Sequence, residues 1–303
     1  MDGCDSLENV HKRGALRRRW SRIAAALGLA AAVILLPATL LAQRATQEAP
    51  AERRLFTSYR YLSVGWTDLA VGQLAEAASA LPDDESRFEA LVVLGMALEA
   101  NQNEKGAESS YRRALLAAGD SPDKQGIAQA LLGQLLLKGG RLAEAKEALL
   151  AANRLRSGQA VVLYGLAEVA EAEGAHDDAI ALLNEADAIS PEWVAPARRA
   201  ARLYLAGGRY AEAAKLLAPK RSVASGDADF HFQFARSLQG LLAAVERGES
   251  LPADLAGALG VDAAAPAPGL TGLIRHAADR TLQLAPGHAG AQAILESLSR
   301  ERP

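Results

Sequence analysis

The stretch GQLLLKGGRLAEAKEALLAA, residues 133–152, decides how this chain folds. Ala145 has Gly133 twelve residues before it, Gly140 five residues before it and Leu149 four residues after it. Side chains separated by three, four or seven positions share one face of a helix. A left-handed backbone between two helices costs little only at glycine. The stretch therefore predicts a helix, a tight turn at Gly140 and a second, antiparallel helix.

The same arrangement recurs along the chain around alanines that lie 37, 38, 34 and 34 residues apart. These alanines are Ala70, Ala107, Ala145, Ala179 and Ala213. The large residue four positions later is, in the same order, Leu74, Tyr111, Leu149, Leu183 and Leu217, and the small residue twelve positions earlier is Ser58, Gly95, Gly133, Ala167 and Ala201. The turn contains Gly65, Gly140, Gly174 and Gly208, whereas Gln102 stands there in the second copy. A fixed period of about 34 residues predicts an all-α solenoid of stacked helical hairpins, and such solenoids offer extended concave surfaces.

This pattern resembles the tetratricopeptide repeat family, whose units carry a small residue in the first helix and alanine with leucine or an aromatic residue in the second. Pro82 and Pro191 stand where that family has a closing proline. The resemblance implies a right-handed solenoid with units at residues 51–84, 88–121, 126–159, 160–193 and 194–227. The tryptophan usual in this family is missing from its place in every unit.

A sixth unit begins near Ala228, but we expect its second helix only at Leu270–Ala285, followed by a capping helix at residues 288–300. Residues 240–269 would be an insertion between the two helices. Residues 263–269 are rich in alanine and proline, which favours an extended backbone. Long insertions in compact domains are usually functional or disordered, so a partner-binding loop and a tolerated insertion are both open interpretations.

The N-terminal part of the sequence predicts a membrane anchor. Residues 23–42, IAAALGLAAAVILLPATLLA, carry no charge, and about 20 such residues span the hydrocarbon core of a bilayer. Basic residues before the run, which keep that end in the cytoplasm, are Lys12, Arg13, Arg17, Arg18, Arg19 and Arg22. We therefore expect a cytoplasmic tail at 1–22, a transmembrane helix at 23–42, a linker at 43–50 and a periplasmic solenoid at 51–303, held in the bacterial inner membrane. A cleaved signal peptide is the alternative.

Small residues on the anchor favour close packing between membrane helices. Ala24, Gly28 and Ala31 are spaced to share one side of the anchor, and we expect that side to contact another membrane protein. A tether surrounded by lipid is the alternative, because alanine is common throughout the chain.

The sequence carries no motif for catalysis, metal binding or cofactor binding. It lacks a glycine-rich phosphate loop, a His-Glu-x-x-His motif and a Gly-x-Ser-x-Gly motif, and its one cysteine, Cys4, precedes the apolar run. A formal net charge of −3 gives no electrostatic basis for nucleic-acid binding. We therefore expect neither an enzyme nor a cofactor, and no nucleic-acid partner.

The family resemblance places a partner-binding groove on the first helices of the units. Carried onto this chain, it implies an apolar entry formed by Phe56, Tyr59, Val92 and Met96, and a basic end formed by Tyr164, Arg198, Arg202 and Arg236. Such a groove suits an extended partner segment of acidic character. The alternative is that the apolar residues belong to the core and the arginines form a solvated face.

Together these expectations favour a non-catalytic, membrane-anchored scaffold. Its partners would be proteins of a respiratory, photosynthetic or secretory complex of the inner membrane, which it would stabilise as an accessory subunit. Residues 23–42 would contact the lipid bilayer. A periplasmic assembly factor or chaperone, which holds exported or membrane-complex proteins transiently, is the alternative.

Overall fold

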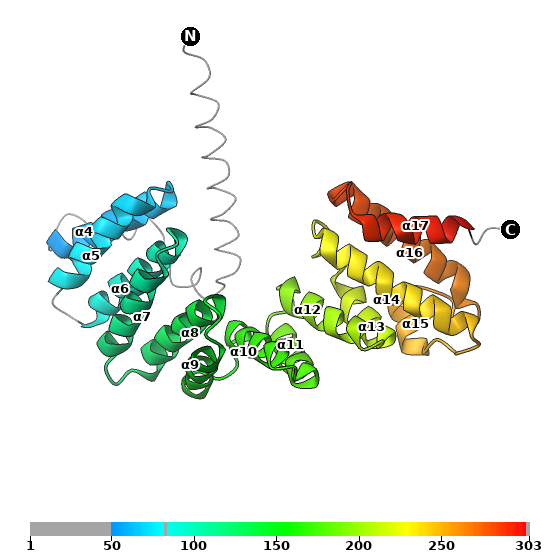
Figure 1. The fold of residues 1–303 in the computed structure, drawn as a ribbon, viewed down its shortest axis with the longest axis horizontal. Coiled ribbons are helices and arrows are strands. Elements are labelled where there is room, and N and C mark those ends of the chain that lie inside the picture. Colours follow the sequence, from blue (N-terminus) through cyan, green and yellow to red (C-terminus); the bar gives the residue numbers. More distant parts are fainter. Residues whose placement is uncertain (1–49, 82–83, 301–303) are drawn as a thin grey trace, which may run out of the picture. The chain divides into compact units, whose positions relative to one another are not determined.

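The computed structural model describes residues 50–81 and 84–300, which are α-helical apart from turns and one 3₁₀ helix (Figure 1). No strand occurs within these ranges. The described residues divide into two compact units, the first ending at Val169 and the second beginning at Ala170, so the boundary falls inside α10 (Ala160–Ala172). Both units are built from successive helical hairpins, which confirms the all-α repeat architecture.

In the first unit, consecutive helices form pairs that pack on one another. The pairs are α4 (Pro50–Ser63) with α5 (Thr67–Ala80), α6 (Asp84–Ala100) with α7 (Glu104–Ala117), and α8 (Pro122–Lys138) with α9 (Leu142–Leu155). Helix starts follow capping signals in the sequence: the Ser121 side chain accepts a hydrogen bond from the backbone N–H of Lys124, and proline follows directly at the first helical position.

The second unit begins with the same hairpin pattern and then departs from it. Its helices are α11 (His176–Ile189), α12 (Val194–Ala206), α13 (Tyr210–Leu217), the 3₁₀ helix η1 (Ala218–Lys220), α14 (Ala228–Glu246), α15 (Ala253–Leu259), α16 (Pro266–Leu284) and α17 (Ala289–Arg300). α14 packs along α16, and α17 packs on α16. The segment expected as an insertion contains the end of α14, the start of α16 and the short helix α15, which packs on α13 and η1.

The proline-rich stretch at residues 263–269 differs from our expectation. α16 begins at Pro266, so part of the backbone that we expected to be extended forms the first turn of a helix. Proline suits this turn because its φ is already helical and because the first N–H groups of a helix have no partner within it. The expected helix at Leu270–Ala285 therefore starts four residues earlier and ends at Leu284.

The recurring alanine and its large neighbour four positions later form the centre of each hairpin. Each of the following residues has 0 % of its surface exposed: Ala70, Leu74, Ala107, Tyr111, Ala145, Leu149, Ala179, Leu183, Ala213 and Leu217. The small residue twelve positions before the alanine is required by this packing. A Cβ atom added to Gly95 would lie 2.3 Å from Cε1 of Tyr111, and one added to Gly133 would lie 2.7 Å from Cγ of Leu149.

The recurring turn glycines adopt the left-handed backbone that the sequence predicts. Their φ angles are 81° at Gly65, 74° at Gly140, 79° at Gly174 and 70° at Gly208. Gln102 takes the same conformation, with φ of 61°, and is the one non-glycine residue with positive φ in the described ranges. A side chain in this conformation costs roughly 1–2 kcal/mol, so the turn between α6 and α7 is strained.

The predicted tail, anchor and linker, including Ala24, Gly28 and Ala31, lie outside the described residues. None of the helices that the structure does describe has the length and apolar character needed to cross a membrane.

Candidate functional site

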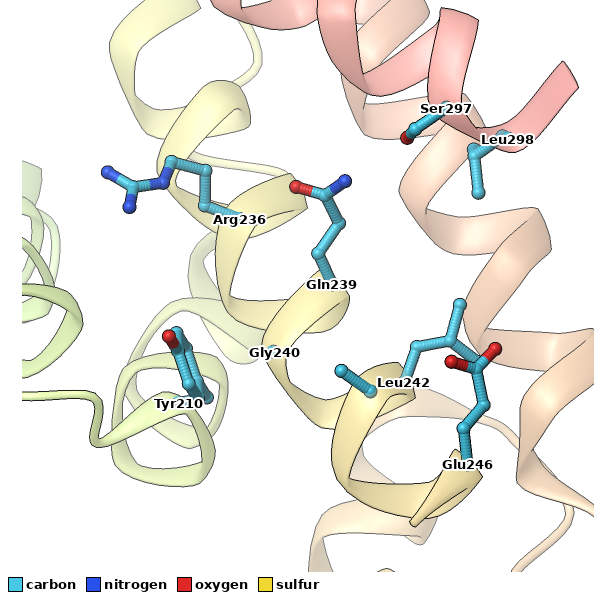
Figure 2. Close-up of a pocket in the computed structure, with 9 residues that line it drawn as sticks. Tyr210, Arg236, Gln239, Gly240, Leu242, Glu246, Ser297 and Leu298 are labelled. Carbon is cyan, nitrogen blue, oxygen red and sulfur yellow. The ribbon is translucent and has the colours of Figure 1, made fainter. Parts of the chain in front are cut away.

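A pocket of about 370 Å³ opens in the second unit between α13, α14 and α17 (Figure 2). α14 supplies one wall, the first residue of α13 a second and the last turns of α17 a third. The lining residues are Tyr210, Arg236, Gln239, Gly240, Leu242, Ala243, Glu246, Ser297 and Leu298. The pocket therefore lies on the helix that begins the irregular sixth unit.

The spacing of residues on α14 produces the main wall. Arg236, Gln239, Gly240, Ala243 and Glu246 follow one another at intervals of three, one, three and three residues. Residues three or four positions apart share a helix face, so these side chains form a continuous stripe. Figure 2 shows the Arg236 and Glu246 side chains at different ends of the group of labelled residues.

Gly240 shapes the floor of the pocket. A Cβ atom there would lie 2.1 Å from Cγ of Tyr210, so only glycine lets this ring approach α14 so closely. Tyr210 stays 36 % exposed, and one part of its surface lines the pocket while another packs on the helix. An aromatic ring with a hydroxyl group is a common anchor in protein interfaces.

The polar groups of the pocket carry charges of both signs. Arg236 and Glu246 are exposed, and neither forms an ion pair with any residue that the structure describes. They are ten positions apart, or about 15 Å along the helix axis. Gln239 lies between them with an amide that can donate and accept hydrogen bonds. The pocket can therefore hold a short segment with an acidic group at one end and a basic group or N–H donor at the other.

The other two predicted basic residues, Arg198 and Arg202, are engaged within the second unit. Nη1 of Arg198 lies 2.6 Å from Oδ2 of Asp227, and Nη2 of Arg202 lies 2.6 Å from Oε1 of Glu171. Asp227 also caps α14 by accepting a hydrogen bond from the N–H of Phe230 at 3.0 Å. These pairs join helices of the second unit, and Glu171 also lies 2.6 Å from Nε of Arg199, so one carboxylate serves two guanidinium groups. A partner-binding role for Arg198 and Arg202 stays a prediction.

The predicted apolar entry lies in the first unit. Tyr59 donates a hydrogen bond from its hydroxyl group to Oε1 of Glu89 at 2.5 Å, and burial together with this carboxylate raises the pKa of Tyr59. Met96 packs against a buried cluster that includes Tyr111. Phe56, Val92 and Tyr164 are half-buried on α4, α6 and α10. Partner binding by this group also stays a prediction.

Among the predicted site residues that the structure describes, Arg236 alone lines the pocket. Sequence reasoning missed Tyr210, Gln239 and Glu246. A signal was nevertheless present, because Gly240 falls inside a helical pattern at a position that the repeat does not require to be small. Such a glycine often marks a close approach to another element. Within the described ranges, no group of three or more His, Cys, Asp or Glu residues is placed to bind a metal.

Comparisons with known proteins agree with this architecture. Residues 170–231 match the tetratricopeptide repeat family model. No curated protein matches the sequence. The crystal structure of the APC/C hetero-tetramer Cut9–Hcn1 is similar with a TM-score of 0.59 and 17 % identity, over 86 % of this chain and 45 % of that chain. This chain therefore spans less than half the length of that protein.

A second similar structure is MamA 41-end from Desulfovibrio magneticus RS-1, with a TM-score of 0.50 and 19 % identity over 58 % of this chain and 96 % of that chain. At these identities the likeness shows the fold alone. The family match and the structural likeness together support a tetratricopeptide-type solenoid, the class of fold expected from the repeat.

Proposed function

We propose that this protein is a non-catalytic tetratricopeptide scaffold that binds a protein segment in the pocket between α13, α14 and α17. The proposal depends on Arg236, whose guanidinium group forms no ion pair with any described residue. Arg198 and Arg202 are paired with carboxylates of the same unit, whereas Arg236 lines the pocket without such a partner among the described residues. An exposed guanidinium beside an aromatic ring and an amide is well placed to bind a carboxylate.

The chemistry of the pocket defines the segment that it would accept. A carboxylate of the segment would pair with Arg236, and its backbone or an amide side chain would bond to Gln239. An apolar or planar group would pack on Tyr210 and Leu298, and a basic group or N–H donor would face Glu246. A volume of about 370 Å³ is at the small end of the range for ligand pockets, so it suits a few residues of an extended chain.

We place this scaffold on the periplasmic side of a bacterial inner membrane. Support comes from the uncharged run at residues 23–42 and the basic residues before it. The scaffold would then serve as an accessory subunit that stabilises a respiratory, photosynthetic or secretory complex.

A periplasmic assembly factor that holds its partners transiently is the second candidate. The modest size of the pocket favours it, because stable complexes bury about 800 Å² on each partner. Purification in mild detergent separates the two candidates. A fixed stoichiometry with one complex supports the subunit, whereas low occupancy by several proteins supports the assembly factor.

Charge reversal at Arg236 tests the binding site itself. We expect Arg236→Glu to lower partner retention by about tenfold, because a lost charge-assisted hydrogen bond corresponds to about one decade in affinity. Retention would be measured by quantitative mass spectrometry of proteins that co-purify with the full chain. The matched control is Arg113→Glu, which reverses another exposed arginine that has no ion pair in the described part of the chain. Equal retention in both variants would reject the pocket as the binding site.

A further inference from the structure

The first hairpin ends in an exposed apolar cluster, the tip patch, formed by Val64, Trp66 and Leu69. Their exposed fractions are 61 %, 58 % and 56 %. Val64 and Trp66 lie in the turn between α4 and α5, and Leu69 lies in the first turn of α5, three residues after Trp66. Three large apolar side chains within six residues are thus mostly in contact with solvent.

Such a patch is unusual for an outer hairpin of a helical solenoid. The end repeats of a solenoid normally present a polar outer face. The Trp66 ring lies 5.9 Å from the ring of Tyr61, and this contact still leaves more than half of Trp66 exposed. Exposed contiguous apolar residues mark a contact with a partner or with a membrane.

A basic stripe on α4 leads to the tip patch. Arg53, Thr57 and Arg60 are separated by four and three residues, which places them on one side of α4, and Val64 follows four residues later in the turn. Arg53 and Arg60 are exposed and form no ion pair within the described ranges. In contrast, the guanidinium of the neighbouring Arg54 lies 2.5 Å from the carboxylate of Glu76. The stripe therefore presents two arginines without an ion-pair partner among the described residues next to apolar side chains, while Asp68, an exposed carboxylate within the tip patch, accepts a hydrogen bond from Asn101.

We propose that the tip patch and the basic stripe lie on the headgroup region of an anionic lipid bilayer. Tryptophan favours the membrane interface, and exposed arginines are attracted electrostatically to anionic lipid. The proposal rests on the anchor at residues 23–42 that forms part of the proposed function. The segment 43–49 joins that anchor to α4, and seven extended residues reach about 25 Å.

The length of α4 fits this arrangement. Its 14 residues measure about 21 Å, so the whole stripe from Arg53 to Arg60 can lie along the bilayer surface. The first hairpin would then have a fixed orientation to the membrane instead of moving freely on its linker. The rest of the first unit would be oriented with it, through the packing of α5 on α6 and of α7 on α8.

Quenching of tryptophan fluorescence by brominated lipid tests this contact in the full chain. The protein contains three tryptophans, Trp20, Trp66 and Trp193. One variant keeps only Trp66 and a second keeps only Trp20, with phenylalanine in the other two places. A third variant lacks all three and carries Leu116→Trp on α7, where the leucine is 82 % exposed. Each would be reconstituted into phosphatidylglycerol-containing vesicles, and circular dichroism would verify its helix content.

We expect brominated lipid to quench most of the Trp66 emission and to leave the tryptophan at position 116 unquenched. Quenching of Trp20 alone would overturn the surface contact while leaving the anchor in place. Quenching of Trp66 alone would support the surface contact and reject the anchor, and quenching of neither would reject both. A blue-shifted Trp66 emission without lipid quenching would show that protein covers the patch and would also overturn the proposal.

Charge reversal separates the lipid headgroups from a purely apolar contact. The variant Arg53→Glu/Arg60→Glu should lose most of the Trp66 quenching in anionic vesicles, because its stripe now repels the surface. The matched control Arg113→Glu/Arg154→Glu reverses two exposed arginines, on α7 and α9, that form no ion pair within the described ranges, and this variant should keep the Trp66 quenching. Unchanged quenching in the stripe variant would overturn the role of anionic lipid.

Discussion

Each of the two compact units contains a glycine that makes room for a tyrosine ring, but the two tyrosine rings differ in their exposure to solvent. In the first unit Gly95 and Tyr111 belong to one hairpin, Tyr111 is 0 % exposed, and its hydroxyl group donates to Glu99 at 2.5 Å. In the second unit Gly240 receives Tyr210, which belongs to the preceding hairpin and remains 36 % exposed beside a pocket. A glycine that faces a tyrosine ring therefore completes the buried core within one hairpin, whereas the same arrangement between two hairpins borders a pocket.

We expect the largest loss of stability from a substitution that fills the space at Gly95. Gly95→Ala would place a methyl group against the fully buried ring of Tyr111, and overpacking of this kind costs roughly 1–3 kcal/mol. Equilibrium unfolding in urea, followed by circular dichroism, measures this loss. The matched control is Gly72→Ala on α5, where an added Cβ would meet nothing within 4 Å. That control should gain about 0.5–1 kcal/mol from helix propensity. If the free energy of unfolding of Gly95→Ala equals that of the unmodified protein, the hairpin core can adjust to the added methyl group and this prediction is wrong.

The equivalent change at Gly240 should separate stability from binding. In Gly240→Ala the half-exposed Tyr210 ring can rotate toward solvent, so we expect a smaller loss of about 1 kcal/mol, partly offset by helix propensity. Because the ring then leaves its place in the pocket, partner retention should fall together with that of Arg236→Glu. Unfolding in urea and quantitative co-purification measure the two effects. A stability loss as large as that of Gly95→Ala would remove the distinction between the two glycine–tyrosine pairs.

We expect the smallest change in stability at the turn of the hairpin that contains Gly95. Gln102 holds a φ of 61° where the corresponding turns have glycine. Gln102→Gly should therefore stabilise the protein by about 0.5 kcal/mol, since glycine adopts this conformation without the steric cost but gains more conformational freedom in the unfolded chain. The reciprocal change, Gly140→Ala, should destabilise the hairpin of α8 and α9 by a similar amount, and thermal unfolding would compare the two. The two variants should change the stability in opposite directions. A loss of stability in Gln102→Gly would show that the turn is not strained.

The hairpin core was predictable because its steric requirement repeats at fixed offsets. Ala145, Gly133, Leu149 and the left-handed Gly140 could each be assigned from spacing alone. The Gly240–Tyr210 contact could not, because it joins two consecutive hairpins at positions outside that pattern. Its only sequence signal is a glycine without a role in the repeat.

The ion pairs of the predicted basic cluster were also missed, for a different reason. The partners of Arg198 and Arg202 do not lie on the same helix, because Asp227 and Glu171 are 29 and 31 residues away in the sequence. That separation is close to one repeat period. Arg141 bonds to Glu108 across 33 residues in the same way. Opposite charges about one period apart in the sequence are therefore a signal for these contacts, because stacked hairpins bring such positions together.

The tight contact between Gly95 and Tyr111 has a consequence for how such a chain can change by recombination. Both partners lie in the same hairpin, as do Gly133 and Leu149. Duplication or loss of a whole hairpin carries each pair along intact. A crossover that joined α4 to α7 would instead set Ser58, which carries a Cβ atom, against the ring of Tyr111, where an added Cβ on Gly95 would already lie 2.3 Å from Cε1. Gene rearrangements that exchange complete hairpins therefore preserve these core contacts, whereas those that divide a hairpin can bring a Cβ atom against a ring.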